Sequence, residues 1–493
     1  MLINKKSAMK NILIILPFFL LQVLKGDENS FSFAGYTSFS YISRLSDQTL
    51  IDIPYRMGSL NFEKQLENVS FNGNITVEYH VRDDASFVET SDPQDFILDM
   101  RELYLTYSKN NYEVRVGKQI HSWGNVDENS PLDNASALDY YYMFFSGTER
   151  KLATLSGSLD YYLKNLKIST VFSPLHSTNR IPLGKDDFPV ELPIYPESHE
   201  IYQVESSPYE GGIYVNYSGS FGDLSFSSFS GYDRIFNFSG VNEYYYSSVG
   251  LFKPSPDLVF GYRKTNILGL GATILNKYFT LRFDIANFKT EDKNKSIRRP
   301  DPSTNSIYDS LAFSYPLQEK ATYQQYTLQI ETELPFDFNL TMQYFKHHLK
   351  EYNAVDTLPD VDVDIPGFEY DPSTMKPEDL FIPGMGVPIA ILTNNALLMT
   401  LKKTFLDEQL TFNFTSMMDI ATYIGVDRIA GSLNELKIEY SINQDLNILL
   451  GLTNIIGSGK KKDGTHIHPD GEDYQFNKME NFSHNRFELK YYF

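Results

Sequence analysis

The stretch at residues 485–493 reads NRFELKYYF and alternates between two kinds of side chain. The odd-numbered residues from 487 on are apolar or aromatic, and the even-numbered residues are mostly charged. The two sets are Phe487, Leu489, Tyr491 and Phe493, and Arg486, Glu488, Lys490 and Tyr492. A period of two places the sets on opposite faces of a β-strand. An apolar face opposite a charged face predicts a strand that separates an apolar phase from water.

The same alternation recurs upstream in residues 71–80, 279–286, 336–343 and 410–415. Turn-forming residues make eight tight links between such runs. These links are Glu67–Asn68, Lys109–Asn111, Lys164–Asn165, Ser220–Asp223, Asn276–Lys277, Leu334–Pro335, Asp407–Glu408 and Asn443–Asp445. Nine mostly long, polar segments separate the hairpins, at 45–56, 82–97, 121–147, 175–208, 233–259, 291–320, 350–389, 422–427 and 457–480.

Seventeen links join about 18 strands, although this count does not exclude 16. An even number of strands with alternating short and long links is typical of bacterial outer-membrane barrels. We therefore predict an all-β fold, a transmembrane antiparallel up-and-down β-barrel with short periplasmic turns and long extracellular loops. The alternating tail ending in Phe493 resembles the C-terminal strand of outer-membrane proteins. That resemblance implies that Phe487, Leu489, Tyr491 and Phe493 are a signal for the barrel-assembly machinery. The edge strand of a soluble sheet is the alternative.

The N-terminus has the pattern of an export signal. Lys5, Lys6 and Lys10 precede the apolar run Ile12–Val23, which is short for a transmembrane helix. We predict a signal peptide at 1–26 and the barrel at 27–493, with an uncleaved membrane anchor as the alternative.

Composition narrows the classes of function. The chain has 493 residues, no Cys, 35 Tyr, 36 Phe and one Trp. The absence of Cys excludes disulfides and thiolate chemistry. A net charge of −20 argues against nucleic-acid binding and hints at a preference for cations. A mean hydropathy of −0.32 fits a barrel with a wet lumen better than a helical membrane protein.

The segment 101–133 contains the most distinctive motif. A strand that ends in Gly117 and Gln119 is followed by Trp123, Gly124 and Asp127. This order resembles a group of large, mostly uncharacterised porin-like outer-membrane barrels, similar to alginate-export and substrate-selective porins. The resemblance covers about 35 residues and implies a channel or transport role without naming a solute.

The loop that follows this strand, at 121–147, is acidic. By analogy with general porins, it is expected to fold inward and narrow the pore, with its carboxylates opposite arginines of the wall. Pore and constriction candidates are Glu113, Arg115, Asp127, Glu128, Asp133, Arg282 and Asp284. The alternative is an exposed loop with Trp123 anchored at the rim.

Other chemistry has weaker support. Asp360, Asp362 and Asp364 could hold Ca²⁺, but a solvated acidic loop is the better interpretation. His466, His468, Asp470 and Glu472 are metal-ligand types in an expected surface loop. We find no hydrolase elbow, zinc-protease motif or phosphate loop in the sequence, and therefore expect neither an enzyme nor a cofactor.

The expected function is passive or selective diffusion of small or extended polar solutes through an outer-membrane channel. Expected partners are outer-membrane lipid, the barrel-assembly machinery and an unidentified polar solute. Homo-oligomerisation is left open. Two alternatives remain: an attachment barrel that binds surface polysaccharide, and an outlet for apolar compounds fed by a periplasmic partner.

Overall fold

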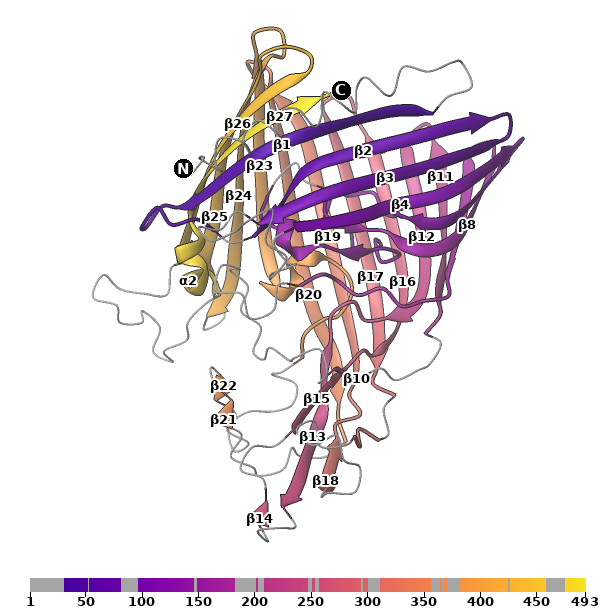
Figure 1. Cartoon of the computed structure of the whole chain (residues 1–493), viewed down its shortest axis with the longest axis vertical. Helices are drawn as coiled ribbons and strands as arrows, with labels where there is room; N and C mark the ends of the chain where they lie inside the picture. Colours follow the sequence, from indigo (N-terminus) through magenta and orange to yellow (C-terminus); the bar gives the residue numbers. More distant parts are fainter. Residues whose placement is uncertain are drawn as a thin grey trace, which may run out of the picture.

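The computed structural model describes the chain from residue 31 onward, except for residues 52, 81–95, 146–148, 182–200, 203–207, 247–250, 253–256, 294–295, 300–310, 356–363, 366–367, 370–380, 424–425 and 458–474. Within the described residues, 18 strands form one closed antiparallel sheet (Figure 1). Each strand pairs with the next barrel strand along the chain, and β27 pairs with β1. The predicted up-and-down barrel of 18 strands is confirmed. The signal peptide expected at 1–26 lies outside the described residues.

The barrel strands have the following bounds: β1 (Ser32–Arg44), β2 (Pro54–Leu66), β3 (Val69–His80), β4 (Phe96–Lys109), β5 (Tyr112–Gln119), β8 (Thr154–Leu163), β9 (Leu166–Ser173), β11 (Glu210–Gly219), β12 (Gly222–Tyr232), β16 (Lys264–Leu275), β17 (Phe279–Glu291), β19 (Lys320–Leu334), β20 (Phe338–Asn353), β23 (Asn395–Phe405), β24 (Leu410–Tyr423), β25 (Val426–Ser441), β26 (Leu446–Gly457) and β27 (His484–Tyr492).

Tight turns join the strands at one end of the barrel, and all eight predicted turns are present. Glu67, Asn110 and Lys164 adopt the left-handed backbone conformation, which matches the twist of two-residue hairpins. One link at the opposite end is shorter than expected. β24 ends at Tyr423 and β25 begins at Val426, where we predicted a loop over 422–427.

The C-terminus lies at the tight-turn end, where it closes the barrel seam. The N–H of Phe493 donates to the carbonyl oxygen of Gly35 (3.0 Å), and the N–H of Gly35 donates back to Phe493 (2.9 Å). A Cβ atom on Gly35 would lie 2.9 Å from Phe493 Cζ and would clash with the Ser59 carbonyl oxygen. Glycine is therefore required for the close approach of these strands.

The wall has an apolar outer face, as β16 illustrates. Leu268, Leu270 and Ile274 are exposed on its outer side. The alternate positions Gly269 and Gly271 face the lumen, where their missing side chains leave room for Leu132 and Asn125 of the loop inside the barrel. Exposed apolar residues at every second position fit a strand whose outer face contacts lipid.

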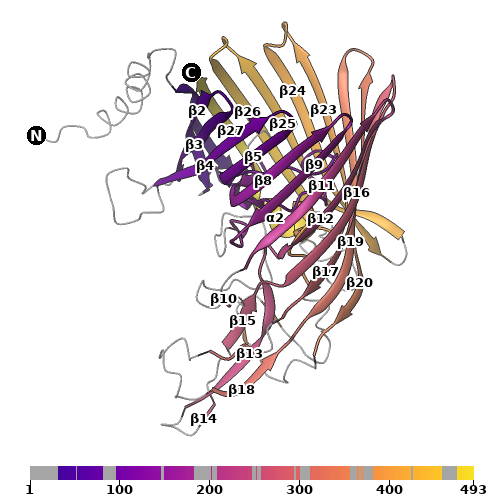
Figure 2. The same ribbon diagram turned by 90° about the vertical axis from the view of Figure 1, so that its right-hand side faces the viewer.

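A small second sheet projects beyond the barrel at the end opposite the tight turns (Figures 1 and 2). Its strands come from three loops and are β10 (Ile201–Tyr202), β13 (Asn237–Tyr246), β14 (Leu251–Phe252), β15 (Asp257–Gly261) and β18 (Leu311–Pro316). A strand pair, β21 (Asp364–Ile365) and β22 (Phe368–Glu369), belongs to another loop. The short helix α2 (Gln475–Met479) precedes the last strand.

Several loops turn inward and share an apolar core with the wall. The core includes Ile51 and Ile53 from one loop, and η4 (Pro388–Ile391) and α2 from two others. A further loop contributes η2 (Tyr140–Tyr142) and the residues up to Phe145. The sequence predicts polar loops, of which the one at 121–147 is expected to fold inward. These parts instead bury apolar side chains, because association removes their apolar surface from water.

Candidate functional site

The described parts of the loop between β5 and β8, residues 120–145 and 149–153, lie inside the barrel, and we call them the inner loop. Asp284 on the β17 wall anchors it and is fully buried. Its Oδ2 accepts hydrogen bonds from the N–H groups of Asn125 (2.7 Å) and Val126 (3.0 Å) and from Ser130 Oγ (2.8 Å). Its Oδ1 accepts a fourth from Asn125 Nδ2 (2.7 Å). Asp284 therefore binds the inner loop, whereas it was expected to face the path of the solute.

The Gly117–Asp127 motif has a packing explanation. Gly117 and Gly124 both have positive φ angles, of 141° and 108°, which side chains rarely adopt. Gln119 is fully buried and donates to the carbonyl oxygen of Ser156 (3.0 Å). Trp123 is 7% exposed and stacks on Tyr214 (centroids 5.8 Å apart). Trp123 is thus part of the lumen core and does not anchor at the rim.

The other pore candidates lie on or beside the inner loop. Asp127 pairs with Arg282 (2.8 Å), which also reaches Glu331 (3.3 Å). Glu128 pairs with Arg150 (3.0 Å), and Asp133 pairs with Lys151. Asp127 and Arg282 therefore bring the acidic loop and the basic wall together as a direct ion pair, and not as charges facing each other across an open gap. The pairs of Glu128 and Asp133 lie within the inner loop.

Glu113 and Arg115 lie elsewhere on the lumen wall. Arg115 Nε is 3.4 Å from Glu113 Oε1, and its Nη2 is 3.4 Å from Asp160 Oδ2. Lys167 also reaches Asp160, at 3.0 Å. These residues face the lumen as predicted, in a cluster that belongs to the wall alone.

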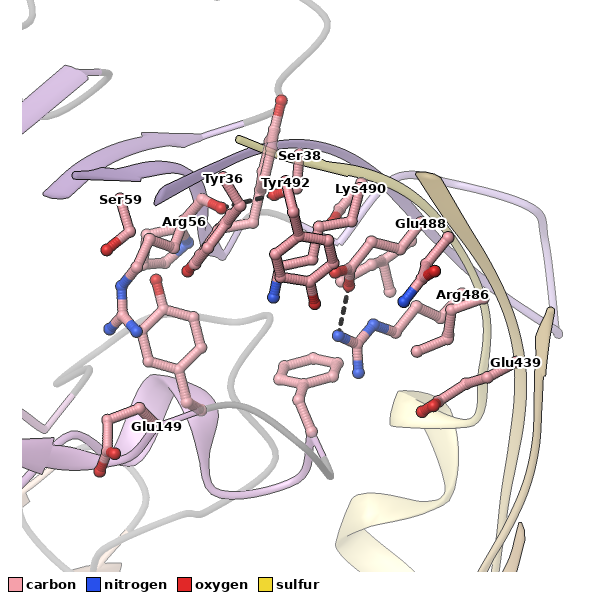
Figure 3. Close-up of a pocket in the computed structure, with 18 of the residues that line it drawn as sticks. Tyr36, Ser38, Arg56, Ser59, Glu149, Glu439, Arg486, Glu488, Lys490 and Tyr492 are labelled. Atoms are coloured by element: carbon pink, nitrogen blue, oxygen red, sulfur yellow. Dashed lines mark hydrogen bonds and ion pairs between the residues drawn. The ribbon is translucent and has the colours of Figure 1, made fainter. Parts of the chain in front are cut away.

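A cavity of about 560 Å³ occupies the lumen between the inner loop and the tight-turn end, and we call it the vestibule. Its wall comes from β1 to β4 and β25 to β27, and Tyr142, Phe145 and Glu149 of the inner loop bound it on the loop side. Figure 3 shows Arg56, Arg486 and Lys490 among its lining groups. Lys490 Nζ lies 3.8 Å from the ring centroid of Tyr36, a cation–π geometry.

The vestibule carries more positive than negative charge. Its basic residues are Arg56, Arg101, Lys437, Arg486 and Lys490, and its acidic residues are Glu149, Glu439 and Glu488. Five positive and three negative charges leave a formal excess of two positive charges. The alternation of residues 485–493 predicts that Arg486, Glu488 and Lys490 share the charged face of their strand, whereas nothing in the sequence singles out Arg56 or Arg101. Residues 54–66 carry a weak alternation, and only the closure of β1 on β27 brings β2 to this cavity.

A buried ion cluster joins the inner loop to the wall beside the vestibule. Arg180 Nη1 donates to Glu78 Oε2 (2.7 Å), and Arg180 Nη2 lies 2.6 Å from Asp139 Oδ2. The Tyr142 hydroxyl donates to Glu78 Oε1 (2.9 Å). Arg56 Nη2 lies 3.6 Å from Glu78 Oε1, and the Arg56 guanidinium sits 4.9 Å from the Tyr142 ring centroid.

Burial shifts two titratable groups of the inner loop in opposite directions. It lowers the pKa of His121 to about 4, and His121 Nε2 lies 2.8 Å from Ser156 Oγ. It raises the pKa of Asp139 to about 6, and the nearby Arg180 only partly offsets this. At neutral pH the folded chain therefore holds His121 uncharged.

The remaining sequence candidates are less well placed. Asp360 and Asp362 lie outside the described residues, as do His466, His468, Asp470 and Glu472, and only the backbone of Asp364 is described, at the start of β21. Within the described part of the chain, no three His, Cys, Asp or Glu side chains are grouped closely enough to hold a metal ion. No described helix is long and apolar enough to cross a membrane.

Comparison with known proteins gives neighbours by structure alone. No protein-family model and no curated relative matches the sequence. The solved structure of OccAB4 from Acinetobacter baumannii aligns with 95% of this chain and 100% of its own, at 9% identity and a TM-score of 0.47. OccK2 (OpdF) from Pseudomonas aeruginosa in complex with glucuronate aligns with 95% of this chain and 99% of its own, at 10% identity and 0.45. OpdK from Pseudomonas aeruginosa, solved with vanillate, aligns with 95% and 100%, at 9% identity and 0.45. Identity near 10% and TM-scores below 0.5 do not carry these ligands over to this chain.

Proposed function

We propose that this chain is a channel for small polar solutes in the outer membrane of a Gram-negative-type bacterium. The observation that carries the proposal is a polar, charged vestibule inside a closed barrel whose outer wall is apolar. Closure pairs the backbone of every barrel strand on both sides, which is the condition for a sheet to reside in lipid. Passage of solute, and not catalysis, matches the absence of hydrolase motifs from the sequence.

Features at both ends of the chain support this location. The basic and apolar pattern of residues 1–26 favours export. Phe487, Leu489, Tyr491 and Phe493 alternate along the strand that closes the seam, which suits recognition by the barrel-assembly machinery. The outer wall would then contact membrane lipid through residues such as Leu268 and Leu270.

The charge of the vestibule favours anions. Its excess of two positive charges contrasts with the net charge of −20 of the whole chain, from which a cation preference was expected. Charges that line a confined, low-dielectric passage act on a solute more strongly than charges on distant loops, which salt screens. These charged groups also disfavour the passage of apolar compounds.

The test is the reversal potential of the refolded full chain in a planar bilayer under a KCl gradient. The proposal predicts openings with chloride favoured over potassium. The Lys490→Gln variant is expected to weaken that preference. A matched control is Lys264→Gln, because Lys264 contacts Tyr209 and Tyr232 at the loop end of the barrel, away from the vestibule. A preference for potassium in the parent protein would contradict the anion assignment.

A second candidate is an attachment barrel, and two observations favour it. Apolar loop residues such as Tyr140, Met143 and Phe144 fill the lumen beside the vestibule. The sheet of β13, β15 and β18 also projects beyond the barrel, where it could meet a surface polysaccharide (Figure 2). A correctly folded barrel that never conducts would favour this second function.

A further inference from the structure

The segment 137–145 of the inner loop forms a roof over the vestibule, and we call it the roof segment. Tyr142 and Phe145 line the cavity on its loop side. Ala137, Tyr140 and Tyr142 are each no more than 3% exposed. In the channel proposed above, this segment covers the vestibule on the side of the inner loop. Its attachments therefore bear on how the vestibule opens toward the loop end.

The charged attachments of the roof segment gather at the ion cluster of Glu78, Arg56, Asp139 and Arg180. Glu78 and Arg56 belong to the paired strands β3 and β2 of the wall. Asp139 belongs to the roof segment, and Arg180 belongs to the next loop. The backbone of Arg180 is hydrogen-bonded to the residues on either side of Asp139. The N–H of Tyr140 donates to the Arg180 carbonyl oxygen (2.9 Å), and the N–H of Arg180 donates to Leu138 (2.9 Å).

The cluster is charge-balanced, with two guanidinium groups and two carboxylates. Glu78 and Asp139 side chains are 5% and 2% exposed. Removal of one member leaves an uncompensated buried charge, which is far more costly than the intact set. Backbone hydrogen bonds also hold the start of the roof segment: Ala137 and Leu138 pair with Leu152 and Lys151, and the N–H of Asp139 donates to the Arg150 carbonyl oxygen (2.7 Å). The ion cluster is the charged link between residues 139–145 and the wall strands β2 and β3.

The inner loop has a separate attachment at Asp284, on the β17 wall. That anchor holds residues 125–130 and does not involve the roof segment. Loss of the ion cluster would therefore free residues 139–145, while residues 125–130 and the backbone pairing of Ala137 and Leu138 stay in place. Two independent anchors on one loop allow one part to move and the other to remain fixed.

We propose that Glu78, Arg56, Asp139 and Arg180 are a latch that holds the roof segment across the lumen, and that release of this latch opens the vestibule toward the loop end. The proposal rests on the channel function proposed above. It assigns a gating role to Arg180, whose partner Glu78 lies 102 positions away in the sequence.

The latch can be tested without relying on conductance, because the chain has no Cys. The Met143→Cys variant places a thiol on the buried part of the roof segment that the latch holds, since Met143 is 7% exposed, and its rate of maleimide labelling reports exposure of that part. Arg180→Gln and Glu78→Gln in this background are each expected to raise the rate by about tenfold or more. Lys167→Gln is the matched control, because it breaks a lumen ion pair with Asp160 that does not touch the roof segment.

Heat-modifiability on gels confirms that each variant remains a folded barrel. Unchanged labelling in both folded latch variants would overturn the latch. Conductance in a planar bilayer then separates the two proposals. Faster labelling with larger or more frequent openings supports the gate. Faster labelling with conductance equal to a conducting parent overturns the gate, and no conductance in the parent or any variant overturns the channel itself.

Discussion

Replacement of Asp284 by alanine is expected to release the inner loop from the β17 wall. Four donors from the loop converge on this fully buried carboxylate, at 2.7–3.0 Å. Each buried donor left without a partner costs roughly 1–3 kcal/mol. With about 1–2 kcal/mol for each of four neighbouring donors, whose effects overlap, the substitution should weaken loop docking by on the order of 4–8 kcal/mol. If the free energy that docks the loop in the parent protein is smaller than this loss, the loop will leave the wall in the variant.

The assay uses the single Trp of the chain as the reporter. Trp123 sits two residues before Asn125 and packs between Tyr214 and Phe229 of the wall. In the parent protein we expect a blue-shifted emission and weak quenching by acrylamide. In Asp284→Ala the emission should shift to the red, and the quenching constant should rise clearly, because the indole would meet water.

The matched control is Asp160→Ala. Asp160 is also a buried aspartate of the lumen wall, at 4% exposed, but its ion-pair partners are the wall residues Arg115 and Lys167. Its removal should leave Trp123 as shielded as in the parent. Equal quenching of Trp123 in the parent and in a folded Asp284→Ala barrel would refute the anchoring role of Asp284.

Three further outcomes are expected. Lys490→Glu changes the vestibule from two excess positive charges to none, so the chloride-to-potassium permeability ratio should fall toward one; an unchanged reversal potential would count against the vestibule as the selective passage. Burial lowers the pKa of His121 to about 4, so the docked loop holds this side chain uncharged. The contribution of uncharged His121 to the free energy of loop docking is complete above pH 6.5, the usual pKa of His, and is lost as the pH falls toward 4. The loss is at most about 3 kcal/mol. Asp139, with its pKa raised to about 6, acts in the opposite sense, because its protonated form is favoured when the loop is docked. The acid-induced change in Trp123 emission should therefore be compared between the parent and the His121→Gln variant, and the change should be smaller in the variant. Identical pH curves for the two proteins would argue against this role of His121. Gly35→Val places a branched side chain against Phe493 and the Ser59 carbonyl group, so the yield of heat-modifiable barrel should drop, whereas Gly157→Val, at a position with open space around its Cβ, should fold normally.

The barrel was predictable because its signals are local. The alternation of Phe487, Leu489 and Tyr491 needs only a strand with two faces. Tight turns such as Lys109–Asn111 need only residues that accept a left-handed backbone. Eight such turns and the longer links between them were enough for 18 strands.

The site was less predictable because its contacts connect distant parts of the chain. Asp284 was placed on the inner face, but its donors lie about 155 positions earlier, so that its role as an anchor was hidden. Arg180 went unnoticed in a loop, since nothing nearby in the sequence points to Glu78. The sequence does carry one signal for the buried part of the inner loop. The apolar run from Tyr140 to Phe145 within an acidic loop indicates that these residues are buried.

Single-channel recording of the refolded chain in a planar bilayer shows whether solute passes through this barrel. The parent and the Arg180→Gln variant should be recorded side by side under a KCl gradient. We expect openings in both proteins, with chloride preferred and with larger or more frequent openings in the variant. If both proteins are folded, heat-modifiable barrels that never conduct, the chain is not a channel.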